Sequence, residues 1–192
     1  MKLLSSEQGK KHLENLLPRF GDCYLRTLAQ FQVVAFSFYG SMNKRAKPTV
    51  FHNLLVNYIM AEFHDDKNIK FYPSHETLII VIDDLIALRF KKLDEKGQPR
   101  NKKSDRNDQL VAQDYTLFED VPSITLLDFG YSINETWTEF EYISVACNLN
   151  GISLWLIYIT KEGGATLLTS ANPNPPLPDE SESGVTWIFN AK

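Results

Sequence analysis

The spacing of apolar residues changes near residue 69 from a helical period to a strand period, and this change restricts the fold more than any other feature of the sequence. Up to that point, apolar residues recur three and four positions apart. This spacing predicts three helices, over residues 7–17, 22–38 and 49–64. Pro18 is expected to end or bend the first helix, and Asp22 is expected to cap the second.

After residue 69, β-branched runs and alternating patterns replace the helical spacing. They predict strands over residues 69–72, 77–82, 85–91, 124–133, 137–149 and 152–159. Asp83-Asp84 and Asn150-Gly151 are residue pairs that suit two-residue hairpin turns. Helices followed by a run of strands predict an α+β fold, in which the N-terminal helices pack on one face of a mostly antiparallel sheet of about six strands.

The composition changes again after residue 162. A proline-rich stretch over 171–178 leads into the acidic residues Asp179, Glu180 and Glu182, and residues 185–190 then have the pattern of a late strand. The sequence therefore predicts a single α+β domain over residues 1–162. It predicts that residues 163–192 form a Pro-rich acidic tail with a candidate edge strand.

Charge is divided unevenly along the chain. Residues 1–110 carry 18 Lys and Arg against 13 Asp and Glu, and residues 111–192 carry 2 against 11, which together give the net charge of −4. The acidic C-terminal part would attract a basic partner surface, and the basic part would attract nucleic acid. The alternative is that the two parts fold together and partly neutralise each other.

The chain has two cysteines, Cys23 and Cys147, and its N-terminus lacks the apolar segment of a signal peptide. Two lone thiols suit a reducing compartment, so we expect both to be reduced, buried and inert. The longest apolar runs are far shorter than the ~20 residues that a membrane helix needs. These features predict a cytoplasmic protein without a membrane partner, and they leave its oligomeric state open.

The sequence contains no strong pattern for covalent, metal or cofactor chemistry. The four histidines lack the paired spacing of zinc ligands, and neither a nucleophile motif nor a phosphate-binding glycine loop is present. We therefore expect no cofactor, no bound metal and no catalytic residue, which argues against an enzyme without excluding one.

A magnesium-dependent nuclease of the PD-(D/E)XK type is one alternative. Glu62 lies on a predicted helix, Asp83 or Asp84 follows a strand, and this order suits carboxylates that hold Mg²⁺. Lys91 on the next strand would orient the attacking water. However, the position that should be acidic, two residues before Lys91, is Arg89, which would repel a cation. A simple turn at Asp83-Asp84 is the other interpretation.

Nucleic-acid binding without catalysis is a second alternative. Arg89 and Lys91 form a predicted basic stripe on one strand, and a basic loop follows, so phosphate groups could be contacted along both. The candidate residues are Lys91, Lys92, Arg100, Lys102 and Lys103. A basic face that is merely solvated would give the same pattern.

A family resemblance is carried by Phe90-Lys91-Lys92-Leu93, by Gly97 and Asn101, by the Gln109 and Gln113 region, by Asp128-Phe129-Gly130-Tyr131 and by Trp155-Leu156-Ile157. With these segments, residues 50–160 resemble a group of small bacterial and prophage proteins. Such proteins are often encoded beside toxin-like metallopeptidases of the ImmA/IrrE kind and are regarded as antitoxins or defence-system partners. The resemblance implies binding and neutralisation of a partner, and it supplies no catalytic residue.

The first hypothesis from the sequence is therefore a non-enzymatic protein-binding module. It would be an antitoxin or regulatory partner in a toxin–antitoxin or phage-defence system, and its partner would be a protein. The acidic residues Asp179, Glu180 and Glu182 would steer that partner, and Trp187 would anchor it, because tryptophan often anchors interfaces.

Overall fold

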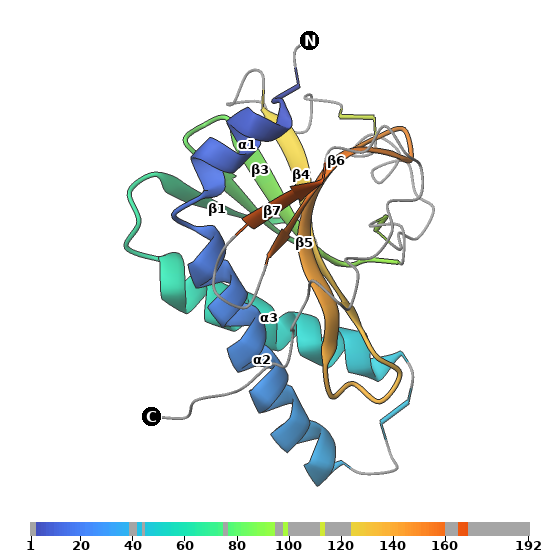
Figure 1. Cartoon of the computed structure of the whole chain (residues 1–192). Coiled ribbons are helices and arrows are strands. Elements are labelled where there is room, and N and C mark those ends of the chain that lie inside the picture. The colour runs from blue at the N-terminus through green and yellow to red at the C-terminus, as the bar shows by residue number, and fades with distance from the viewer. Residues whose placement is uncertain are drawn as a thin grey trace.

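The computed structural model of the chain describes residues 3–38, 42–43, 45–74, 77–94, 98–99, 112–113, 124–159 and 165–168. In this part of the chain, three helices precede one sheet, so the predicted α+β fold is confirmed (Figure 1). None of the described helices combines the length and the hydropathy that crossing a bilayer would require.

The three helices are α1 (Ser6–Leu13), α2 (Leu17–Ser37) and α3 (Ala46–Phe63). Ser5 caps α1, because its Oγ accepts a hydrogen bond from the Gln8 N–H while the Gln8 side chain accepts one from the Ser5 N–H. Pro18 lies in the first turn of α2, where its missing N–H does no harm because first-turn N–H groups have no helical partner.

The prediction that Asp22 caps a helix is wrong. Asp22 lies inside α2, and its carboxylate pairs with Arg26 one turn later, at 3.2 Å. The first helix also ends earlier than predicted, at Leu13, and α2 begins before Pro18 because proline suits the start of a helix better than its end.

The sheet holds its strands in the order in which they occur along the chain. They are β1 (Ile69–Ser74), β2 (Thr77–Ile82), β3 (Ile86–Lys92), β4 (Thr125–Ile133), β5 (Phe140–Leu149), β6 (Ile152–Ile159) and β7 (Ala165–Leu168). All neighbours pair antiparallel except β3 and β4, which are parallel. The six predicted strands are therefore present, and the short β7 extends the sheet beyond residue 162.

Tight turns connect the hairpins where the sequence predicts them. Asp83 and Asp84 both have φ of 54°, and Asn150 and Gly151 have φ of 50° and 77°, which is the left-handed backbone of a two-residue hairpin turn. The β4–β5 turn contains Trp137 with φ of 62°, so β5 begins at Phe140 and not near residue 137.

The helices cover one face of the sheet, which we call the first face. Phe20 of α2 packs against Phe129 of β4, with ring centres 5.1 Å apart, and Phe51 of α3 packs against Tyr131, with ring centres 4.6 Å apart. The Tyr24 hydroxyl donates a hydrogen bond to the Phe129 carbonyl at 2.9 Å. The first face and the helices thus share one aromatic core.

The opposite face, which we call the second face, is also buried although no described helix packs on it. Parallel pairing of β3 and β4 requires the chain between them to cross a face of the sheet. In the described part of that connection, Leu93 packs with Tyr142 and Leu156 on the second face. The predicted basic stripe is therefore wrong at Arg89, which is only 1% exposed because the second face is covered.

Candidate functional site

The acidic residues of the predicted nuclease site are each held in a separate ion pair. Glu62, near the end of α3, accepts hydrogen bonds from Arg19 at 3.0 Å and from Arg26 at 2.9 Å, and these bonds hold the pKa of its carboxyl below the usual range. In the β2–β3 turn, Asp83 lies 3.1 Å from His12, and the carboxylate of Asp84 lies 2.6 Å from the Lys70 ammonium.

These acidic residues are not brought together around one point. Within the described ranges, no group of three or more His, Cys, Asp or Glu side chains is arranged to hold a metal ion. Lys91 lies two residues after Arg89 on β3, so its side chain lies on the second face of the sheet and away from the β2–β3 turn. The arrangement that a two-carboxylate Mg²⁺ site needs is therefore not formed by Glu62, Asp83 and Asp84.

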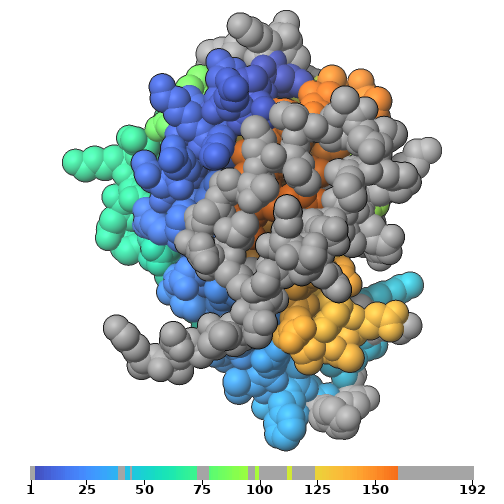
Figure 2. All heavy atoms as spheres, in the orientation of Figure 1, coloured from blue at the N-terminus to red at the C-terminus, as the bar shows by residue number. Residues whose placement is uncertain are grey.

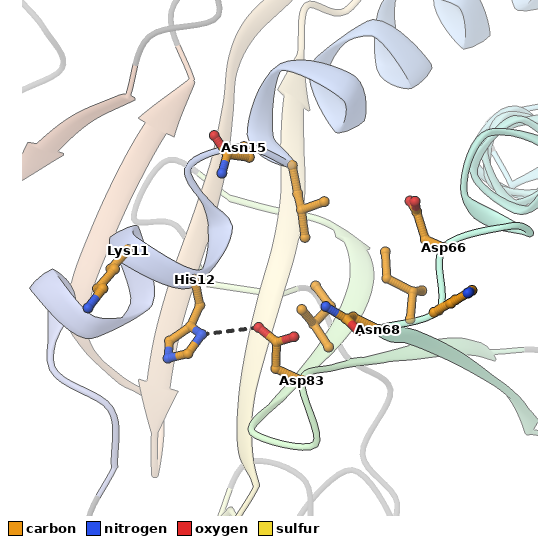
Figure 3. A pocket seen from close by; sticks show the side chains of 10 residues that line it. Lys11, His12, Asn15, Asp66, Asn68 and Asp83 are labelled. Carbon is orange, nitrogen blue, oxygen red and sulfur yellow. Dashed lines mark hydrogen bonds and ion pairs between the residues drawn. The ribbon is translucent and has the colours of Figure 1, made fainter.

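A pocket of about 420 Å³ opens between the end of α1, the α3–β1 loop and the β2–β3 turn (Figure 3). The His12 ring turns towards Asp83 in this pocket, whereas Lys11 points away from the pair. The lining residues are Lys11, His12, Asn15, Leu16, Asp66, Lys67, Asn68, Ile69, Ile82 and Asp83.

The pocket offers a histidine–carboxylate pair but little else that catalysis requires. A histidine held through Nδ1 by a carboxylate, as His12 is by Asp83, can serve as a general base. Among the described lining residues there is no Ser, Thr, Cys or Tyr to act as a nucleophile, and Asp66 is held by Arg19 at 2.8 Å. We therefore interpret the His12–Asp83 pair as a link between α1 and the β2–β3 turn.

A buried polar network lies on the second face, across β3, β4 and β5. Arg89 donates from Nε and Nη2 to Asp128 Oδ1, at 2.7 and 2.6 Å. Asn148 donates to the other Asp128 oxygen at 2.9 Å, and Gln98 donates to the Asn148 side chain at 2.9 Å. Asp128 has an opposite charge beside it and a hydrogen-bond donor for each oxygen, so the two ions can be buried together. Arg89 Nη1 has no hydrogen-bond partner within the described residues.

Gln113 joins two strands on the same side of the molecule. Its side-chain amide donates to the carbonyls of Leu126 and Asn148 and accepts from the Leu126 N–H, each at 2.8 Å. These bonds serve backbone groups of β4 and β5 just where the paired register of the two strands ends. Gln113 belongs to the resemblance described above, and its observed contacts are structural.

The two lysines of the predicted nucleic-acid site point to opposite faces of the sheet. Lys91 is half-buried, and burial together with the charge of Arg89 lowers its pKa. Lys92 lies on the first face, with Nζ 4.8 Å from the centre of the Trp137 ring. The described residues therefore do not form one basic stripe, and Arg100, Lys102 and Lys103 lie outside them.

The C-terminal half of α2 carries apolar residues on two opposite sides. Leu28 and Phe31 are buried in the core, whereas Val33 is 63% exposed and Phe36 is 80% exposed. Together with the exposed Ala29, Val33 and Phe36 lie on the side opposite the core, and we call these three residues the outer face of α2. Figures 1 and 2 show this end of α2 projecting past the β4–β5 hairpin.

An apolar outer face is unusual for a helix on the surface of a soluble domain, because the solvent side normally carries charged residues. The spacing of apolar residues predicts the buried side of α2 and does not reveal this second side. The signal that does so is the absence of any charged residue between Arg26 and Lys44.

The predicted interaction residues Asp179, Glu180, Glu182 and Trp187 lie outside the described residues. Comparisons of the chain with known protein families, with curated proteins and with solved structures find no match.

Proposed function

We propose that this chain works by binding another protein through the outer face of α2. The observation that supports this proposal is the exposure of Phe36 and Val33 on a helix whose opposite side is already buried in its own core. Large aromatic side chains within an apolar patch are frequent anchors of a protein interface.

The spacing of the outer face favours a partner that accepts one helix side. Ala29, Val33 and Phe36 lie at positions i, i+4 and i+7, which is the pattern of a helix that docks against a groove or another helix. Removing Val33 and Phe36 from water would contribute about 1.5–3 kcal/mol for each side chain. The partner surface should be apolar and uncharged, because α2 carries no charge there.

The role of antitoxin or regulatory partner, which the resemblance implies, is one form of this proposal. Such a protein neutralises its target by covering it, and an exposed apolar helix side is suited to that task. The acidic residues of the predicted tail would act at longer range, by steering a basic partner into contact.

The product of the neighbouring gene is the partner to test first, because the resemblance implies that the partner is encoded there. We expect the two proteins to co-purify after co-expression. Phe36→Glu should weaken the complex at least tenfold, because it places an unpaired charge in an apolar contact. Ile152→Glu is the matched control, since Ile152 is 65% exposed but lies at the β5–β6 hairpin.

Two results would contradict this proposal. One is a complex that forms equally well with Phe36→Glu, which would place the contact elsewhere on the chain. The other is a wild-type chain that does not bind the product of the neighbouring gene when the two are co-expressed.

A further inference from the structure

The pocket between the end of α1, the α3–β1 loop and the β2–β3 turn is separate from the outer face of α2, which lies in the C-terminal half of that helix (Figure 1). We propose that this pocket binds a nucleoside monophosphate, with the base against its apolar inner wall and the phosphate beside its lysines. Such binding is independent of the proposed contact between α2 and another protein.

The walls of the pocket are joined to one another, so its shape exists before any ligand binds. His12, near the end of α1, lies 3.1 Å from Asp83 in the β2–β3 turn, and the Asp83 N–H donates to the Asn68 carbonyl at 3.1 Å. The volume of about 420 Å³ lies within the range of small-molecule sites, about 300–1,000 Å³. A preformed pocket loses little free energy in ordering its own walls on binding.

The charges that line the pocket favour an anion. Both lining carboxylates, Asp66 and Asp83, already have a partner, at 2.8 and 3.1 Å. Lys11 and Lys67 also line the pocket, and within the described ranges neither of them pairs with a carboxylate. Both lysines are exposed, so a phosphate group would contact them at the rim through charge-assisted hydrogen bonds.

The other lining residues suit a flat ring with polar edges. Leu16, Ile69 and Ile82 are half-buried or buried, so they form an apolar inner wall that a base can cover. Asn15 and Asn68 also line the pocket, and among the described residues no hydrogen bond occupies either side-chain amide (Figure 3). An amide presents a donor beside an acceptor, which matches the edge of a nucleobase.

Isothermal titration calorimetry of the full chain with adenosine monophosphate tests the proposal. We expect saturable binding with a Kd below about 1 mM. Ribose 5-phosphate lacks the base and adenosine lacks the phosphate. Each should bind about tenfold more weakly or worse, because each gives up one of the two contacts.

Variants at the pocket show where the nucleotide binds. Lys67→Glu should raise the Kd for adenosine monophosphate about tenfold or more, because it places a like charge beside the phosphate. Arg45→Glu is the matched control, since it reverses the charge of an exposed residue at the other end of α3, and it should bind as the wild type does. Asn68→Ala should weaken binding of adenosine monophosphate and leave that of ribose 5-phosphate unchanged.

Three results would overturn the proposal. They are a wild-type chain that shows no saturable binding of adenosine monophosphate, an equal Kd for the nucleotide and either of its two fragments, and a Lys67→Glu variant that binds as the wild type does. None of them bears on the complex with the neighbouring gene product, because Lys67 and Asn68 lie away from Val33 and Phe36.

Discussion

Arg89 shows how strongly the environment of one residue can differ from what its neighbours in sequence suggest. It alternates with apolar residues on β3, as a solvent-facing residue would, yet its guanidinium is buried against Asp128. The reason is the covered second face, which local alternation does not reveal because it depends on how residues beyond β3, among them Leu93 and Gln113, pack against the sheet. Removing one partner of a buried ion pair lowers stability strongly, whereas replacing both partners with apolar residues lowers it much less.

We expect Asp128→Leu to lower the free energy of unfolding by about 3–5 kcal/mol, because it leaves the Arg89 guanidinium buried without its counter-ion. The double variant Arg89→Met, Asp128→Leu should lose much less, because it removes both charges. Urea denaturation of the three proteins measures the difference. Equal losses in the single and double variants would show that the pair is not buried as described.

The two cysteines should be unreactive in the folded protein. Burial raises the pKa of the Cys23 thiol to about 11 and that of Cys147 to about 12, so little thiolate forms near pH 8. Titration with a chromogenic disulfide reagent should find no fast-reacting thiol in the native chain and two after unfolding in guanidinium. One fast thiol in the native protein would contradict the burial of that cysteine.

At the scale of elements, Glu62 holds α2 and α3 together through Arg19 and Arg26. Its pKa is lowered by these partners, so it stabilises the fold above its unfolded pKa and loses that effect as the pH falls through its folded pKa. Glu62→Gln should lower stability at neutral pH by on the order of 1 kcal/mol. The difference from wild type should shrink as the solution becomes acidic.

The pH series should be compared with Glu14→Gln, whose carboxylate is exposed on the first turn after α1. That variant should lower stability at neutral pH less than Glu62→Gln does, because the Glu14 carboxylate is exposed. If Glu62→Gln differed from wild type most at acidic pH, the result would contradict a lowered pKa for Glu62 in the folded protein.

Gly9 determines how closely α1 approaches β6. Alanine normally stabilises a helix interior by up to about 1 kcal/mol relative to glycine. Here a Cβ at Gly9 would lie 2.8 Å from the ring of Trp155, whose Nε1 is held by the Leu4 carbonyl. We therefore expect Gly9→Ala to lower the melting temperature. In a Trp155→Phe background, which removes the contacting atoms, the same change should raise it.

Local patterns account for most elements of this fold. The change of period near Ile69 and the pairs Asp83-Asp84 and Asn150-Gly151 predict the helices, the strands and two hairpin turns, because these depend on neighbouring residues. The short β7 was not predicted, since four residues carry too little pattern.

The candidate site was less predictable because it depends on what the elements leave uncovered. Whether Val33 and Phe36 face another layer of structure or solvent depends on what packs on the outer side of α2, and no spacing along α2 records that. Likewise, Glu62, Asp83 and Asp84 have the order of a metal site, but tertiary partners separate them.

At the scale of the whole molecule, the chain has an aromatic core between helices and sheet, a covered second face, and one apolar helix side that no described residue covers. Large contiguous apolar patches on a protein surface often mark binding sites. Its occupation by another protein is the central claim.

Labelling of single introduced cysteines tests this claim most directly, because both native thiols are buried. Val33→Cys and Ile152→Cys replace residues of nearly equal exposure, 63% and 65%, so both should react equally fast in dilute purified protein. In the cells that produce the protein, we expect the cysteine at position 33 to react several-fold more slowly than the one at position 152. Equal rates at the two positions inside the cell would contradict a protein-binding role for the outer face of α2.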